Sequence, residues 1–344
     1  MSKITILTAS FGTGHRTAAL NLQKILGEES TEVLDWPKLA FPLLNKLVKF
    51  CYLLSVRRFP NLYGFLYKIT DSKKINAAVA KKMSSRRIPI SKESKLLITT
   101  YPLPIKLSKS LKLLTVITDF WYVHAMWLLN PESYYLVMDE KTKENLIKRG
   151  VAAEKITVSH FPLDPLSFRV KSKTHKKIQI TWVLDVGAQP AVRALQIQKT
   201  LKHFPDLEFH IVTGRNTYLY KLLQKQQLTN LKLYSWVDNM PEMLVSSDIN
   251  IIKSGGAMVS EALAAKKPVL LYQSIPGQER GNREFVTQGG YGFYCPHTYQ
   301  LWSKINLLSK KDDNYQQITE NLGKLDYGRK NQDIPRLIDN LLKN

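Results

Sequence analysis

The chain has 344 residues, of which 44% are hydrophobic and 10% aromatic, a composition that excludes a disordered protein and favours about two globular domains. Its two cysteines, Cys51 and Cys295, form no CxxC pair and exclude a disulfide framework, which fits a protein of the reducing cytoplasm. The formal net charge of +22 at pH 7 points to an anionic partner, either nucleic acid or a membrane surface.

The N-terminal residues have no signal-peptide profile, and the first predicted strand is the short apolar run at residues 3–8. It runs into Gly12-Thr-Gly-His15 and then into a helical pattern from Ala18 to Leu26, which is how a βαβ unit begins. The turn lacks the third glycine of a dinucleotide fingerprint, which argues against such a cofactor. Gly14 would let a ligand approach the backbone closely, and His15 would lie at the strand edge where these folds bind ligands. A turn with an incidental histidine is the alternative.

The next segment, residues 38–112, concentrates the charge, because it has 17 Lys and Arg and only two Asp and Glu, a net charge of +15. Apolar residues at helical spacing between 43 and 54 precede an aromatic-rich run at 59–67. No apolar run approaches the about 20 residues of a membrane-spanning helix. We therefore interpret the segment as lying in an anionic membrane interface, with cations over lipid phosphates. The residues assigned to this surface are Arg57, Arg58, Phe59, Tyr63 and Phe65.

Two other interpretations of the basic segment stay open. It can be a solvated basic surface around ordinary core helices. Nucleic-acid binding is less favoured, because no helix-turn-helix, zinc-finger or RNP-type signature accompanies the charge.

Strands are predicted at residues 96–99, 113–118, 134–138 and 155–159, with a helix at 141–149. Asp119 and His124 follow the second of these strands closely. Either side chain has the chemistry of a general base for a hydroxyl acceptor, or the two orient one another. A structural aspartate and a hydrogen-bonded core histidine form the alternative.

A polar, basic run at residues 167–177 is predicted to link two domains, 1–166 and 178–315. In the second domain, strands are expected at 178–184, 209–213, 231–234, 249–252 and 268–271, and helices at 191–203, 218–226, 240–246 and 260–265. Residues 316–344 are expected to form C-terminal helices that pack back onto the first domain. The alternation of strands and helices predicts two parallel α/β domains.

Two polar loops of the second domain follow neighbouring predicted strands. Ser254-Gly-Gly256 opens a helix whose free backbone N–H groups favour phosphate oxygens, and Glu261 lies further along that helix. Gln278, Glu279 and Asn282 supply the acceptors and amide donors that hold sugar hydroxyls. A tight turn and a polar surface loop are the alternatives. No Asp-x-Asp, HExxH or Cys/His cluster is present, so no metal ligands are predicted.

Taken together and in order, these segments resemble the lipid glycosyltransferases of the GT-B fold, above all the monogalactosyldiacylglycerol synthases and the bacterial processive diacylglycerol glucosyltransferases. The matching segments are Gly12-Thr-Gly-His15 with Ala18-Ala19, Thr118-Asp119-Phe120 with His124 and Trp127, Ser235-Trp-Val-Asp-Asn-Met-Pro-Glu242, Ser254-Gly-Gly with Glu261-Ala, and Pro276-Gly-Gln-Glu with Asn282. The last two segments, at their mutual spacing, are specific, whereas the glycine turn alone is not.

The resemblance implies an α/β protein of the GT-B fold, with two Rossmann-like doubly wound domains that face a cleft. The N-terminal domain would take the lipid acceptor and the C-terminal domain the UDP-sugar. The implied donor-binding residues are Ser254, Gly255 and Gly256 for the diphosphate, Glu261 for the ribose, Trp236 and Val237 for the uracil, and Gln278 and Glu279 for the hexose. Gly14 and Asn282 are also expected to bind the donor. His15 and Asp119 would lie at the acceptor hydroxyl, one of them as the base, with His124 on the acceptor side.

The implied reaction is an inverting transfer of glucose or galactose to a diacylglycerol-type lipid, without a bound metal or other cofactor. It would take place at the inner face of the cell membrane. Two alternatives stay open: N-acetylglucosaminyl transfer to a lipid-linked peptidoglycan precursor, and a non-catalytic, membrane-bound UDP-sugar-binding protein.

The sequence departs from the family pattern at four places. Ser254 and Met258 stand where the family often has Pro and Thr, so the threonine hydroxyl is absent. Leu184-Asp-Val-Gly-Ala-Gln189 has one glycine in a turn that is glycine-rich in the family, and His160-Phe-Pro162 replaces a Gly-x-Pro.

Overall fold

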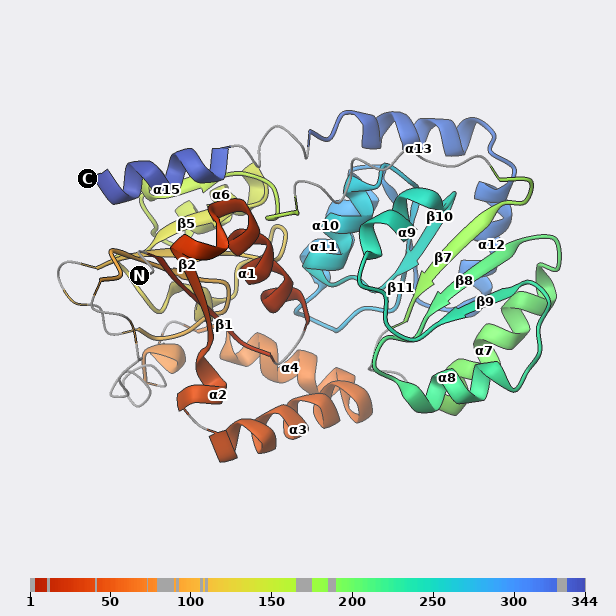
Figure 1. Cartoon of the computed structure of the whole chain (residues 1–344), viewed down its shortest axis with the longest axis horizontal. Coiled ribbons are helices and arrows are strands. Elements are labelled where there is room, and N and C mark those ends of the chain that lie inside the picture. Colours follow the sequence, from red (N-terminus) through yellow and green to blue (C-terminus); the bar gives the residue numbers. More distant parts are fainter. Residues whose placement is uncertain are drawn as a thin grey trace. The chain divides into compact units, whose positions relative to one another are not determined.

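The computed structural model describes residues 4–10, 13–40, 42–72, 74–78, 90, 93–105, 108, 111–164, 175–184, 190–326 and 333–343. The chain divides into two compact units, each containing its own sheet (Figure 1). The first unit comprises Met1–Pro165, Pro276–Gly281 and Tyr327–Asn344, and the second comprises Leu166–Ile275 and Asn282–Asp326. Gly12, most of the predicted linker and the turn at 185–189 lie outside the described residues.

Six parallel strands form the sheet of the first unit, in the order β2-β1-β3-β4-β5-β6. Their bounds are β1 Ile4–Thr8, β2 Thr31–Asp35, β3 Leu96–Thr99, β4 Lys112–Val116, β5 Tyr134–Val137 and β6 Ile156–Val158. The central strands β1 and β3 are buried along their whole length, because helices or loops cover both faces of a parallel sheet. The strand order reverses between β1 and β3, and folds of this kind bind ligands at such a reversal, beyond the carboxyl ends of the strands.

The C-terminal helix completes the core of the first unit. Helix α15 (Asp333–Lys343) lies beside α1 (Thr13–Leu26), as Figure 1 shows. Its residues Ile334, Ile338 and Leu341 recur at helical spacing and are buried in one cluster with side chains of β1, β3, β4 and β5. Each such burial contributes about 1.5–3 kcal/mol, so the last helix of the chain stabilises the domain that contains the first strand.

Two adjacent helices, α3 (Pro42–Arg58) and α4 (Pro60–Thr70), follow the short helix α2 (Trp36–Ala40) (Figure 1). The helical spacing at residues 43–54 predicted α3 correctly, and Pro60 occupies the first position of α4, where its missing N–H costs little. Helix α6 (Glu140–Lys148) also belongs to this unit, residues 74–78 are helical, and Ala125–Leu128 form a 3₁₀ turn. Within the described part of the chain, no helix is long and apolar enough to cross a membrane.

The sheet of the second unit is also six-stranded and parallel, in the order β12-β11-β10-β7-β8-β9. Its strands are β7 Gln179–Val183, β8 Glu208–Val212, β9 Leu231–Tyr234, β10 Ile249–Ile252, β11 Val269–Tyr272 and β12 Gly292–Cys295. Counted within the unit this is the doubly wound 3-2-1-4-5-6 order. The order reverses between β7 and β10, which places the Ser254-Gly-Gly256 turn at the reversal.

The helices of the second unit are α7 Pro190–His203, α8 Thr217–Gln224, α9 Met240–Ser246, α10 Gly256–Ala264, α11 Arg280–Gln288, α12 Thr298–Ser309 and α13 Asp313–Gly323. Helix α10 begins four residues before its predicted start at residue 260, because Gly255 is the N-cap and Gly256 is already helical. The sequence reading omitted the edge strands β2 and β12. Strand β12 begins with a glycine after a Gly-Gly-Tyr turn, so its pattern resembled a loop. Strand β2 mixes charged and apolar residues and is only partly buried after Thr31.

Candidate functional site

The carboxyl ends of β1, β3 and β4 bring together the candidate catalytic residues of the first unit. His15 lies in the first turn of α1 directly after β1, Thr100 follows β3, and Asp119 follows β4. The hydroxyl of Thr100 donates to the carbonyl of His15 (2.9 Å), and its backbone N–H donates to the carbonyl of Leu7 (3.0 Å). The segments that follow β1 and β3 are therefore tied to each other at the point where the strand order reverses.

The hydrogen bonds of His15 determine which ring nitrogen carries the proton. Nδ1 lies 2.6 Å from the carbonyl oxygen of Thr100, which can only accept, so Nδ1 is the protonated nitrogen. The hydroxyl of Thr118 lies 3.3 Å from the same nitrogen. In this tautomer Nε2 has its lone pair available to take a proton. Burial lowers the pKa of the imidazole, and nearby Asp119 and the Thr100 bond oppose that shift only in part, so the ring is neutral at pH 7.

The turn after Asp119 is held in an unusual backbone conformation. Trp121 has φ 66°, in the left-handed region that bulky residues rarely adopt. Its backbone N–H donates to the hydroxyl of Thr142 (2.8 Å), its indole is buried, and the ammonium of Lys141 lies 3.4 Å from the centroid of the Trp121 ring. On the other side, a Cβ added to Gly281 would lie 1.9 Å from the carbonyl oxygen of Phe120. The backbone next to Asp119 is thus fixed from both sides.

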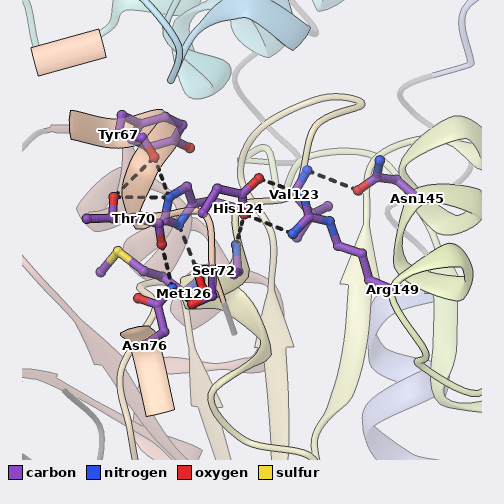
Figure 2. A network of polar contacts seen from close by, with 11 residues as sticks. Tyr67, Thr70, Ser72, Asn76, Val123, His124, Met126, Asn145 and Arg149 are labelled. Carbon is purple, nitrogen blue, oxygen red and sulfur yellow. Dashed lines mark hydrogen bonds and ion pairs between the residues drawn. The ribbon is translucent and has the colours of Figure 1, made fainter. Parts of the chain in front are cut away.

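His124 belongs to a polar network that joins the end of α4 to the segment after Asp119 (Figure 2). Its Nδ1 accepts from the backbone N–H of Met126 (3.2 Å), so Nε2 carries the proton and donates to the carbonyl of Tyr67 (2.9 Å). Burial lowers the pKa of His124, which agrees with a neutral ring. Because both ring nitrogens bind backbone groups, His124 orients α4. Its predicted place on the acceptor side stays a prediction.

Asp71 belongs to the same network. It accepts two hydrogen bonds from the guanidinium of Arg149 (2.9 and 2.8 Å) and one from the backbone N–H of Ala125 (2.7 Å). Burial acts to raise the pKa of the Asp71 carboxyl, but these bonds outweigh it and hold the pKa below its ordinary value. The C-terminal end of α4 is therefore fastened to the 3₁₀ turn and to the end of α6.

The residues predicted to meet a membrane lie on α3 and α4. Phe59 and Phe65 are 53% and 61% exposed, and Arg58 is exposed, whereas the side chain of Arg57 lies outside the described residues. Tyr63 points the other way, into an aromatic cluster with Tyr52 and Tyr67. The large apolar side chains exposed on the two helices are Leu47, Phe50, Leu54, Phe59, Leu62, Phe65, Leu66 and Ile69. They form an apolar surface of a kind that monomeric soluble proteins rarely expose.

In the second unit, the Ser254-Gly-Gly256 turn is held by buried polar contacts. Ser254 is fully buried, and its hydroxyl donates to the carbonyl of Gln273 (3.1 Å). The amide of Asn282, also fully buried, donates to the carbonyl of Ser254 (2.9 Å). Gly255 caps α10 without a side-chain hydrogen bond, so the first backbone N–H groups of that helix have no side-chain cap. An anion at this point would meet those N–H groups and the positive end of the helix dipole.

Glu261 and Trp236 occupy different surroundings in the same unit. Glu261 lies on α10, about one and a half turns from its start, and burial raises the pKa of its carboxyl to about 7. Trp236 is half exposed, its indole N–H donates to Asp238 (2.9 Å), and the guanidinium of Arg215 lies 5.2 Å from its ring. Val237 follows it, partly buried. Their predicted contacts with ribose and uracil stay predictions.

Residues Pro276–Gly281 pack with the first unit, although the sequence assigned them to the second domain. Within this loop Gln278 is half buried and accepts from the hydroxyl of Tyr63 (2.8 Å), whereas Glu279 is 3% exposed. Asn282, also predicted to bind the donor, lies on α11, and its amide donates to the carbonyl of Ser254. Its contact with the donor stays a prediction. Gly14, the second residue of α1, directly precedes His15.

Sequence reasoning missed several residues at these two sites. Thr100 and Tyr101 lie just past the strand predicted at 96–99 and were given no role. Thr100 fixes the His15 tautomer, and the ring of Tyr101 lies edge-on to His15, with centroids 5.1 Å apart. Arg193 is 3% exposed in the first turn of α7, and its guanidinium lies 4.8 Å from the ring of Tyr272 at the end of β11. Arg193 could have been noticed because it is a charged residue within an apolar helical stretch, whereas nothing in the sequence paired Thr100 with His15.

Among the described residues, no group of three or more His, Cys, Asp or Glu could hold a metal ion.

Comparison with known proteins tests the family resemblance. Residues 15–163 match the sequence profile of monogalactosyldiacylglycerol (MGDG) synthase, and residues 186–341 match that of the glycosyltransferase family 28 C-terminal domain. The first half of the chain is therefore similar to the MGDG synthases, and the second half is similar to the C-terminal domain of family 28 glycosyltransferases. The resemblance inferred from the five motifs is confirmed, and so is the expectation that the protein is an enzyme of the glycosyltransferase class.

Individual relatives agree with this assignment. The processive diacylglycerol beta-glucosyltransferase of Bacillus cereus (strain B4264) is 28% identical over an alignment of 344 positions, which covers 92% of this chain and 88% of the relative. The enzyme of the same name from Bacillus mycoides (strain KBAB4) is 27% identical, with the same coverage of both chains.

Solved structures support the fold. The UDP-GlcNAc 2-epimerase of Neisseria meningitidis, bound to UDP-GlcNAc, aligns with a TM-score of 0.64 at 13% identity over 100% of both chains. MurG of Acinetobacter baumannii aligns with a TM-score of 0.62 at 12% identity, over 99% of this chain and 100% of its own. The predicted GT-B fold with two doubly wound α/β domains is confirmed.

Proposed function

We propose that this lipid glycosyltransferase moves glucose or galactose from a UDP-hexose to the hydroxyl of a diacylglycerol-type lipid, with inversion and without a bound metal, at the inner face of the cell membrane. The names of the Bacillus relatives support the acceptor class and a hexose donor. The observation that carries the proposal is the tautomer of His15, whose Nδ1 proton is held by the Thr100 carbonyl so that Nε2 is available as a base.

In the proposed reaction, the lipid hydroxyl oxygen attacks the anomeric carbon from the face opposite the diphosphate. The C–O bond to the hexose forms as the bond to UDP breaks, the hydroxyl proton moves to Nε2 of His15, and UDP leaves with the bonding electron pair. A positioned base of this kind contributes about 10²–10⁴-fold in rate. The nearby carboxylate of Asp119, which already acts to raise the pKa of His15, would stabilise the imidazolium that forms.

The departing diphosphate gains negative charge as the bond breaks. We assign its stabilisation to the uncapped N–H groups at the start of α10, because preorganised backbone donors act where charge develops in the transition state. Glu261 would accept a hydrogen bond from the ribose, the backbone of Trp236 and Val237 would meet the uracil, and Gln278 with Glu279 would hold the hexose. Since backbone groups supply this stabilisation, the reaction needs no divalent cation.

The lipid acceptor would reach His15 beside α3 and α4. The exposed apolar side chains of these helices and the basic residues of segment 38–112 support binding to an anionic bilayer, because lipid phosphates attract such cations with about 1 kcal/mol each. Sedimentation with vesicles that contain or lack anionic lipid, in a salt series, tests this step. We expect binding that weakens with salt, and failure to sediment with anionic vesicles at low salt would contradict it.

The decisive experiment offers radiolabelled UDP-glucose, UDP-galactose and UDP-GlcNAc to the full chain with diacylglycerol vesicles, with and without EDTA. We expect a hexosyl-diacylglycerol of inverted anomeric configuration, at a rate that EDTA does not change. Transfer of GlcNAc to a lipid-linked peptidoglycan precursor in a parallel reaction, with none to diacylglycerol, would favour the first alternative. Binding of UDP-hexose without transfer to any acceptor would favour a non-catalytic protein.

A further inference from the structure

Helix α4 presents two different faces. Leu62, Phe65, Leu66 and Ile69 recur at spacings of three and four residues and are 47–61% exposed. Tyr63, Gly64 and Tyr67 lie between them in sequence and are partly buried against the rest of the unit. One face of α4 is therefore apolar and exposed, and the other packs inside the first unit.

The inner face of α4 packs closely on the loop Pro276–Gly281. A Cβ added to Gly64 would lie 2.8 Å from Cβ of Pro276, so only glycine allows this approach of helix and loop. Gly277, with φ +81°, lies so near that a Cβ there would be 3.0 Å from the ring of Tyr67. Two glycines, one on each partner, thus bring the loop within reach of the α4 side chains.

The hydroxyl of Tyr63 donates a hydrogen bond to Oε1 of Gln278 (2.8 Å) across this contact. Burial, together with neighbouring Tyr52, Tyr67, Tyr101 and Glu279, raises the pKa of the Tyr63 phenol, so it stays protonated and remains a donor. With Oε1 engaged in this way, the two hydrogens on Nε2 of Gln278 are directed away from Tyr63. The bond therefore holds the planar amide with its oxygen toward Tyr63 and its nitrogen away from it.

We infer that Tyr63 is a positioning residue for the donor sugar, which orients the amide of Gln278 so that its Nε2 hydrogens face the hydroxyl oxygens of the hexose. The inference rests on the proposed function in one respect, namely that Gln278 contacts the hexose. Without the Tyr63 hydroxyl the amide is free to turn over and to offer an acceptor in place of donors. Tyr63 acts only through Gln278, so its removal affects the sugar and not the nucleotide.

The test measures the Kd of UDP, UDP-glucose and UDP-galactose by calorimetry for the full chain and for Tyr63→Phe, Gln278→Ala and the double variant. Tyr63→Phe keeps the ring in the aromatic cluster and removes only the hydroxyl. We expect it to weaken the binding of at least one UDP-hexose about three- to tenfold and to leave the Kd of UDP unchanged, as expected for one neutral hydrogen bond. In the double variant the loss should equal that of Gln278→Ala alone. Tyr218→Phe, at a tyrosine that is 60% exposed on α8, is the matched control and should change nothing.

Three results would overturn the inference: a Tyr63→Phe variant that binds the UDP-hexoses like the wild type, equal weakening for UDP and UDP-hexose, or losses that add in the double variant. A wild-type chain that binds no UDP-hexose would overturn it as well. Transfer assays on the same proteins separate this inference from the proposed function. If the wild type transfers hexose and Tyr63→Phe binds the UDP-hexoses as the wild type does, the role of Tyr63 is rejected and the proposed function stands. If no variant transfers hexose but Tyr63→Phe selectively weakens UDP-hexose binding, the proposed reaction is rejected and the role of Tyr63 stands.

Discussion

The two strand-end sites of this protein use different parts of the chain for their chemistry. In the first unit, the ends of β1, β3 and β4 supply side chains, and His15 is held in one tautomer by the Thr100 carbonyl. In the second unit, the segment after β10 presents backbone N–H groups at the start of α10, and the side chains of Ser254 and Asn282 bind backbone carbonyls that hold the turn. Both sites lie where the order of a doubly wound sheet reverses.

The difference follows from what each site has to do in the proposed reaction. A hydroxyl acceptor must lose a proton, and a positioned titratable side chain such as a neutral histidine can accept it. A diphosphate needs several aligned donors, which the first turn of a helix provides without side chains. The same fold topology therefore supports two chemistries, and changes at the two sites should have different consequences.

The largest effect is expected at the first site. His15→Ala should lower kcat about 10²–10⁴-fold and leave the Kd of UDP within about twofold of the wild type, because the base is lost and the nucleotide site is not. Steady-state transfer assays and calorimetry measure the two quantities. Comparable losses in turnover and in UDP binding would instead place His15 in the donor site. They would contradict the division of acceptor chemistry and donor binding between the two units.

The buried carboxyl of Glu261 should give the second unit a pH-dependent stability. Its pKa is raised from 4.5 to about 7, so the folded protein keeps a proton that the unfolded chain has lost. The free energy of unfolding therefore falls as the pH rises from about 4.5 to about 7, by up to about 3 kcal/mol from this group. Glu261→Gln should raise the melting temperature more at pH 8 than at pH 5. An equal shift at both pH values would show that Glu261 titrates normally.

Asn282→Ala tests whether buried side chains hold the turn that carries the backbone donors. Its loss leaves the Ser254 carbonyl buried without that partner and should cost about 1–3 kcal/mol of stability. Because the turn then loosens, we also expect weaker UDP binding. Chemical denaturation and calorimetry measure the two effects. Asn306→Ala, at an exposed position of α12, is the control. An equal loss of stability and of UDP affinity in this control would contradict a specific role of Asn282 in the turn.

The smallest effect is expected from the network at the end of α4. Asp71→Asn weakens the bonds to Arg149 and Ala125, both partly solvated, and should lower stability by about 1 kcal/mol at pH 7. The pKa of Asp71 is lowered by folding, so its contribution is present above the ordinary aspartate pKa of 3.8 and is lost as the pH falls below that value. Thermal melts at pH 7 and pH 3 should therefore differ more for the wild type than for the variant. Equal pH dependence would show that the ion pair contributes nothing.

Local patterns carried much of the fold prediction. Strands such as Leu96–Thr99 and Ile249–Ile252 were placed to the residue, because central strands of parallel sheets are continuous apolar runs with sharp ends. The edge strands β2 and β12 were missed, whereas the edge strands β6 and β9 were predicted from their apolar runs. Asp119 and Gly255 were selected as site residues because each follows a strand closely, and Glu261 because it lies on the helix that Gly255 opens. Their roles stay predictions.

The sequence by itself determined the two α/β halves, the family, the residues after the strands and the basic apolar segment, because periodicity, composition and short motifs are local properties. Only the tertiary structure decided that Thr100 fixes the proton on His15, that both nitrogens of His124 bind backbone groups, and that Tyr63 meets Gln278. These pairs are separated by up to 215 residues along the chain, and their contacts depend on strand order and close packing. The distribution of the net charge of +22 along the chain thus indicated where a lipid surface is expected. The fold decided which ring nitrogens of His15 and His124 carry a proton.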